Sequence, residues 1–151
     1  MDRGDFLEGL GQVSPDGKWL AYTSWEAGRP AVYVRSFPSG AGKWQVSTTN
    51  LGDYPRWRRD GRELYYMNGV SNGKLMAVEI KGNGSTFEPG ATKELFDSGW
   101  FDISHTGNYH PYAVSADGQR FLVPRPTASV TGDPASLPIV VVLDWTAGLR
   151  K

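Results

Sequence analysis

The sequence predicts an all-β fold, and three observations lead to this prediction. The chain contains 19 glycines, 10 prolines and 19 aromatic residues (6 Trp, 7 Tyr and 6 Phe), which favour turns and pleated sheets. No window of about a dozen residues has apolar positions at helical spacing without an interrupting Gly or Pro. An Asp-Gly pair followed by an apolar or aromatic run occurs three times, which indicates a repeated hairpin.

The repeated turns are Asp16-Gly17, Asp60-Gly61 and Asp117-Gly118. The second Asp follows the first by 44 residues, and the third follows the second by 57. The first spacing matches a propeller blade of about 40–45 residues, and the second matches a blade with an insertion. Gly can adopt the positive φ of a hairpin turn, and Asp can accept hydrogen bonds from nearby backbone N–H groups. We interpret these six residues as structural turn residues.

Each turn lies between two predicted strands, and further strands follow it. The first strands end at Val13, Trp57 and Val114, and the second strands are expected at 19–24, 63–67 and 120–124. Third strands are expected at 31–35, 74–80 and 139–143, and fourth strands at 43–47 and 92–96. The repeats span approximately 8–49, 50–97 and 108–151. The last repeat has three strands, and we expect the leading segment 2–7 to complete a blade in trans or a blade of a neighbouring segment.

Three segments carry a resemblance to a known family. The stretches "SPDGKWLAY" (14–22), "YPRWRRDGRELYYM" (54–67) and "PYAVSADGQRFLV" (111–123) resemble the WD40-like repeats of TolB-type propellers. The last segment, "PIVVVLDWTAGLRK" (138–151), is similar to the C-terminal ending of propellers attached to bacterial serine/threonine kinases as sensor domains. The resemblance implies a β-propeller built from four-stranded antiparallel blades.

Ring closure is the problem that the repeat count raises. The propellers of this family close with about six or seven blades, and three blades cannot close a ring. Either a second copy supplies the missing half, or the chain is a fragment of a longer propeller. We favour a homodimer that completes a six-bladed ring, because the leading strand and the incomplete last repeat fit such an exchange.

Composition excludes several classes of function. Sixteen basic and sixteen acidic residues give a formal net charge of zero, so we expect no nucleic-acid partner. No apolar run approaches the roughly 18 residues that cross a bilayer, so we expect a soluble chain without membrane insertion. The chain has no Cys, which excludes disulfides and thiolate zinc sites but leaves the compartment open between the bacterial cytoplasm and, within a longer exported protein, the periplasm.

Arg56 and Arg58 form the densest basic cluster, with Trp57 between them. Alternation along a strand places both arginines on one face, and the first strand of a blade lines the central channel of a propeller. The two arginines could bind an anionic ligand there, and Asp53, in the 50–54 loop, is a further candidate ligand-binding residue. Ion pairing of the arginines with neighbouring carboxylates is the interpretation that we favour, because the other two repeats lack the arginines.

The two histidines, His105 and His110, lie in the insert before the third repeat. Their spacing matches no strong metal-ligand pattern, and we favour a polar connection over a ligand-binding site. The chain has no Gly-x-Ser-x-Gly motif and no phosphate-binding loop, so we expect no catalytic residue, no metal and no cofactor. The sequence thus predicts a non-enzymatic module for protein interaction or ligand sensing. The alternative is a fragment of a larger propeller enzyme or peptidase gate with a site at the channel mouth.

Overall fold

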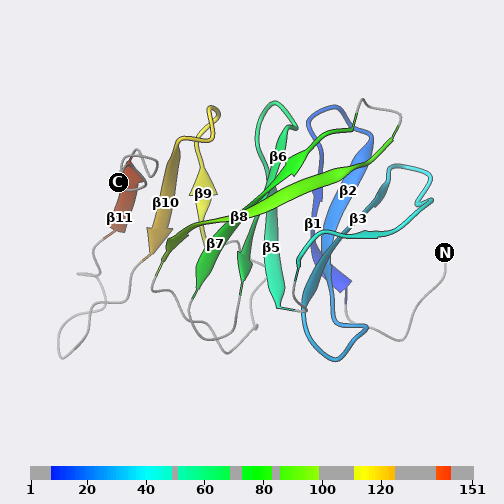
Figure 1. Ribbon diagram of the computed structural model, residues 1–151, viewed down its shortest axis with the longest axis horizontal. Helices are drawn as coiled ribbons and strands as arrows, with labels where there is room; N and C mark the ends of the chain where they lie inside the picture. The colour runs from blue at the N-terminus through cyan, green and yellow to red at the C-terminus, as the bar shows by residue number, and fades with distance from the viewer. Residues whose placement is uncertain are drawn as a thin grey trace.

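The computed structural model describes residues 8–48, 51–68, 73–82, 86–98, 111–124 and 139–143. These residues form eleven strands in three sheets and no helix (Figure 1). The first sheet contains β1 (Glu8–Val13), β2 (Trp19–Ser24), β3 (Ala31–Ser36) and β4 (Trp44–Gln45). The second contains β5 (Gly52–Trp57), β6 (Glu63–Asn68), β7 (Lys74–Ile80) and β8 (Pro89–Asp97). The third contains β9 (Ala113–Val114), β10 (Arg120–Pro124) and β11 (Ile139–Leu143).

Every sheet is an antiparallel meander in which each strand pairs with the next one along the chain. We call the three sheets blade 1, blade 2 and blade 3. The predicted second and third strands are confirmed to within one residue at each end. The predicted leading strand at 2–7 and the insert with the two histidines lie outside the described residues.

The fourth strands differ from the prediction at their ends. β4 is shorter than expected, and beyond its C-terminal end the Ser47 Oγ accepts the Val32 N–H at 3.2 Å, so that a side chain takes the place of a strand carbonyl. β8 is longer than expected, and its pairing with β7 contains two register shifts. Bulges of this kind bend a strand without ending its pairing.

The three Asp-Gly turns share one geometry. In each turn the Asp Oδ1 accepts the backbone N–H two residues later, at 3.2 Å for Asp16, 3.0 Å for Asp60 and 3.0 Å for Asp117. The Gly that follows has a φ of 73°, 74° and 72° respectively. Glycine adopts this left-handed conformation without a Cβ clash. Because the geometry repeats, residues of different blades correspond when they stand at the same distance from the turn Asp.

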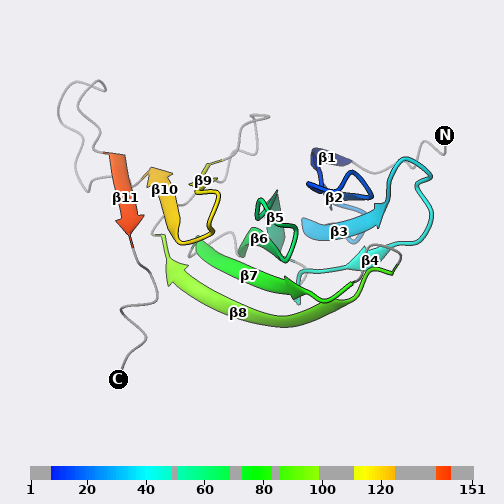
Figure 2. The ribbon, with the colours of Figure 1, turned by 90° about the horizontal axis from the view of Figure 1, so that it is seen from above.

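The blades lie side by side along an arc. Figure 2 shows blade 1 and blade 3 at the two ends, blade 2 between them, and β1, β5 and β9 on the inner side. Successive side chains on a strand point to opposite faces, so a blade in the middle buries both of its faces. In blade 2, one face packs on blade 1 through Leu64, Tyr66, Met76 and Val78. The other face packs on blade 3 through Tyr65, Met67, Leu75 and Ala77.

Candidate functional site

Arg58 lies in the junction between blade 2 and blade 3. Its Nη1 donates to the Glu63 Oε2 at 3.2 Å, and its Nε lies 3.4 Å from the Asp60 Oδ2. The Tyr65 hydroxyl donates to the same Glu63 oxygen at 2.7 Å. A Cβ built on Gly118 would lie 3.1 Å from the Arg58 Cδ, so this side chain reaches the next turn. Arg58 is therefore ion-paired within the junction of blade 2 and blade 3.

Asp53 ties blade 1 to blade 2. It is buried, and its Oδ1 accepts the Thr23 hydroxyl and the Tyr54 N–H, both at 2.8 Å. Tyr54 has a φ of 55°, and the pairing of β5 shifts register there. Leu10 has the corresponding place in β1 and a φ of 57°. A positive φ is rare for non-glycine residues, so this repeated bulge is a built feature of the inner strands, which Asp53 helps to hold in blade 2.

Arg56 lies on β5, and its charge acts on Tyr112 at the junction of blade 2 and blade 3. The Tyr112 hydroxyl donates to the Tyr54 carbonyl oxygen at 2.8 Å. Burial raises the pKa of Tyr112 well above its ordinary value, and the Arg56 charge acts in the opposite direction. The Nε atoms of Arg56 and Arg58 are both buried without a hydrogen-bond partner among the described residues. The structure separates the two predicted arginines, because Arg58 forms ion pairs with Asp60 and Glu63, whereas Arg56 forms none among the described residues.

The remaining predicted ligand residues, His105 and His110, lie outside the described residues. Within the described ranges, no group of three or more His, Cys, Asp or Glu side chains could hold a metal ion. The same ranges contain no helix that is long and apolar enough to span a membrane.

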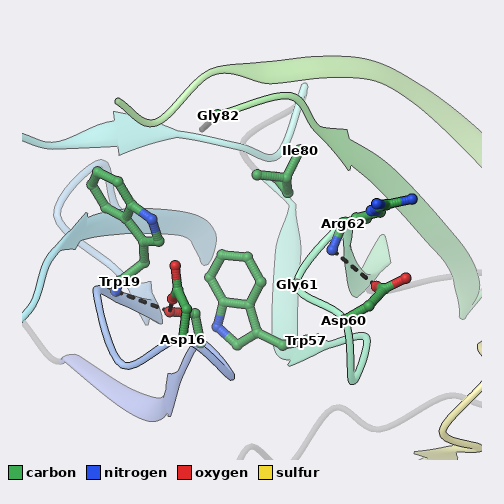
Figure 3. Close-up of a pocket in the computed structure, with 9 residues that line it drawn as sticks. Asp16, Trp19, Trp57, Asp60, Gly61, Arg62, Ile80 and Gly82 are labelled. Carbon is green, nitrogen blue, oxygen red and sulfur yellow. Dashed lines mark hydrogen bonds between the residues drawn. The ribbon is translucent and has the colours of Figure 1, made fainter. Parts of the chain in front are cut away.

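A pocket of about 200 Å³ opens between the turns of blade 1 and blade 2 (Figure 3). We call it the junction pocket, and it is lined by Ser14, Asp16, Trp19, Trp57, Asp60, Gly61, Arg62, Ile80 and Gly82. In Figure 3, the Asp16 carboxylate lies between the indoles of Trp19 and Trp57. The two aspartates serve the turns and the two tryptophans lie on strands, which is why sequence reasoning missed the pocket. The sequence feature that could have indicated the pocket is Ser14, a small residue at the position where the next repeat has Arg58.

The face of blade 1 that is turned away from blade 2 is the second candidate surface, and we call it the outer face of blade 1. Tyr22 and Tyr33 are paired across β2 and β3 there, and both are buried. The Arg35 guanidinium lies 4.4 Å from the Tyr22 ring centroid, and the Lys43 ammonium lies 4.3 Å from that of Tyr33. Burial and a hydrogen bond to Glu26 raise the pKa of Tyr33 to about 12. This face combines aromatic rings with charged side chains.

No protein-family model matches the chain, and no curated protein matches it. Oligogalacturonate lyase from Vibrio parahaemolyticus is a similar solved structure, with 14% identity and a TM-score of 0.54 over 79% of this chain and 30% of that chain. The β-propeller domain of the Trilobed protease from Pyrococcus furiosus has 13% identity and a TM-score of 0.46 over 83% of this chain and 37% of that chain. TolB from Acinetobacter baumannii has 16% identity and a TM-score of 0.41 over 92% of this chain and 44% of that chain.

The fold is that of β-propeller blades. Two four-stranded antiparallel meanders and a third sheet pack face to face, with their first strands on the inner side of an arc. The TM-score of 0.54 to the lyase agrees with this fold, and an identity of 14% extends the likeness no further than the fold. The chain spans less than half the length of each of the three similar proteins.

Proposed function

We propose that the chain is a non-enzymatic β-propeller module for protein interaction or ligand sensing, and that it closes a ring by assembling with a second copy of itself. A closed propeller needs about four to eight blades. The described sheets number three, and the two end blades each have a face that no described blade covers. The side chains on these two faces are the observation that carries the proposal.

The first of these faces is the outer face of blade 1. Each blade packs on the one before it through the residue six positions after its turn Asp. Tyr66 occupies this position in blade 2 and packs on blade 1, and Val123 does the same between blade 3 and blade 2. The corresponding residue of blade 1 is Tyr22. By this equivalence the outer face of blade 1 is shaped to receive a preceding blade.

The second face belongs to blade 3. The residue five positions after the turn Asp packs on the following blade, as Ala21 does in blade 1 and Tyr65 in blade 2. The corresponding residue of blade 3, Leu122, is 41% exposed. A two-fold pair of chains would place the Leu122 face of one copy against the Tyr22 face of the other, twice. That arrangement closes a ring of about six blades and covers both end faces.

Size-exclusion chromatography with light scattering tests the proposal. We expect the wild type to elute as a dimer of about twice 16.6 kDa. Leu122→Lys places a charge in the proposed contact and should give a folded monomer. Ala91→Lys is the control, because Ala91 is exposed on β8 of blade 2, which contributes to neither end face, and this variant should stay dimeric. A monomeric wild type, or a Leu122→Lys variant that remains a dimer, would overturn the self-assembly.

The finer parts of the proposal concern the ends of the chain. If segment 2–7 completes the partner's last blade, Phe6→Lys or Leu7→Lys should weaken the dimer. The similarity of residues 138–151 to kinase-attached propellers leads us to propose that the module senses a signal within a larger assembly. Large aggregates of the isolated chain would instead favour the alternative, a fragment of a larger propeller enzyme or peptidase gate.

A further inference from the structure

The two junctions between blades carry different side chains at one corresponding position. Two residues before the turn Asp, blade 1 has Ser14 and blade 2 has Arg58. The Arg58 side chain extends to the next turn and fills the gap beside Gly118. At the other junction, the atom nearest to a Cβ built on Gly61 is the Pro15 Cδ, at 3.9 Å. The junction pocket is therefore the space that a small Ser14 leaves open.

The junction of blade 2 and blade 3, which Arg58 fills and which we call the filled junction, shows which chemical group this space accepts. The Arg58 guanidinium lies 3.4 Å from the carboxylate of its own turn Asp, Asp60, and donates to Glu63 at 3.2 Å. In blade 1, Asp16 corresponds to Asp60, and Trp19 corresponds to Glu63. The junction pocket thus offers a turn carboxylate and an indole where the filled junction offers two carboxylates.

We propose that the junction pocket binds a guanidinium group. The Asp16 Oδ1 accepts the Ser14 hydroxyl at 2.6 Å and the Lys18 N–H at 3.2 Å, which leaves the Oδ2 for a ligand. Trp19 and Trp57 line the pocket, and a planar cation is attracted to indole rings. Figure 3 shows the Arg62 side chain directed away from both indoles. Arginine-type groups suit this combination, because they pair with carboxylates and stack on aromatic faces.

The size of the junction pocket limits the occupant. Its volume of about 200 Å³ lies below the roughly 300–1,000 Å³ that is usual for drug-sized ligands. The occupant is therefore about the size of one side chain. It comes either from a peptide that inserts an arginine or from a small free guanidinium compound, and the two sources share the same contacts. The pocket lies within one chain, so the proposal does not depend on dimer formation.

A titration followed by NMR tests the proposal, with the indole N–H signals of Trp19 and Trp57 as the readout. We expect saturable shifts with agmatine and with N-acetyl-arginine amide, and none with the uncharged N-acetyl-citrulline amide. Tighter binding of the capped arginine would indicate a peptide source, and tighter binding of agmatine a free compound. The absence of a saturable shift, or equal binding of the citrulline compound, would overturn the proposal.

Matched variants locate the site. Asp16→Asn keeps an Oδ1 acceptor for the turn but removes the charge, so it should weaken agmatine binding by about tenfold or more. Asp117→Asn makes the same change in the third turn, whose Asp also accepts an N–H two residues later, and should leave binding unchanged. Ser14→Arg should fill the pocket as Arg58 fills its junction and abolish binding. Equal losses in the two Asn variants, or unchanged binding in Ser14→Arg, would show that the guanidinium binds elsewhere.

Discussion

The two junctions between blades are built from one repeat, yet they close differently. At the junction of blade 2 and blade 3, Arg58 fills the gap between the turns, and Tyr65 and Glu63 extend its hydrogen-bond network. At the junction of blade 1 and blade 2, Ser14 leaves a pocket between two indoles. The aromatic cores below the turns are well packed in both cases. The repeat thus determines the fold, while the side chain two positions before the turn Asp determines how much of the space between two turns is filled.

The largest expected effect concerns the glycine that receives Arg58. A Cβ at Gly118 would lie 2.5 Å from the Tyr65 Oη, and the φ of 72° is unfavourable for alanine. We expect Gly118→Ala to lower the free energy of unfolding by about 2–5 kcal/mol, from backbone strain and overpacking together. Gly61→Ala, at the junction with the pocket, introduces backbone strain without overpacking and should lower the free energy of unfolding by about 1–2 kcal/mol. Urea unfolding measures both, and equal losses would mean that the two junctions are equally open at the turns.

A second prediction concerns the hydrogen bonds that cross each junction. Thr23→Val removes the hydroxyl that donates to the buried Asp53 carboxylate, and we expect a loss of about 1–3 kcal/mol. Tyr112→Phe removes a bond to a neutral carbonyl at the other junction and should lose about 0.5–1.5 kcal/mol. Thr23→Ser keeps the hydroxyl and serves as the control for the first variant. If Tyr112→Phe proves the more destabilising, the carboxylate at the first junction is not the stronger link.

The smallest effect is a difference in pH dependence. Burial and the hydrogen bond to Glu63 raise the pKa of Tyr65 above its ordinary value of 10.0, so folding favours the neutral phenol. The resulting stability is complete below about pH 10 and is lost as the pH rises toward the folded-state pKa, by up to about 1.4 kcal/mol per pH unit. Tyr65→Phe should therefore flatten the alkaline limb of the stability curve.

Tyr66 provides the comparison at the other junction. Burial raises its pKa, and its buried hydroxyl has no hydrogen-bond partner, and so no carboxylate partner, among the described residues. Tyr66→Phe should therefore flatten the alkaline limb less than Tyr65→Phe does. The measurement is the urea midpoint as a function of pH, and an equal flattening by the two variants would contradict the role assigned to Glu63.

Local sequence patterns were sufficient to predict most of the strands. The turns at Asp16, Asp60 and Asp117 fix the start of each following strand, and β2, β6 and β10 begin at the predicted residues. The bounds of β4 and β8 were wrong, because they depend on the Ser47 side chain and on bulges, which leave no periodic signal.

The candidate site was harder to predict because it depends on packing between repeats. Alternation placed Arg56 and Arg58 on one face, but it did not show that Arg58 crosses to the third turn. The junction pocket joins residues of two turns that lie 44 positions apart in the chain. Only an alignment of the repeats shows that the small Ser14 occupies the position that Arg58 has in the next repeat.

Blade 2 contains both residues that a filled junction between two copies of itself would need, an arginine before the turn and a glycine in the turn. Arg58 reaches forward to the glycine of the next turn, and Gly61 stands at the place where a preceding arginine would arrive. A tandem array engineered from copies of residues 51–97 would bring the arginine of each copy against the glycine of the next. An array copied from blade 1 would instead repeat an open cavity at every seam, which makes blade 2 the better building block for consensus design.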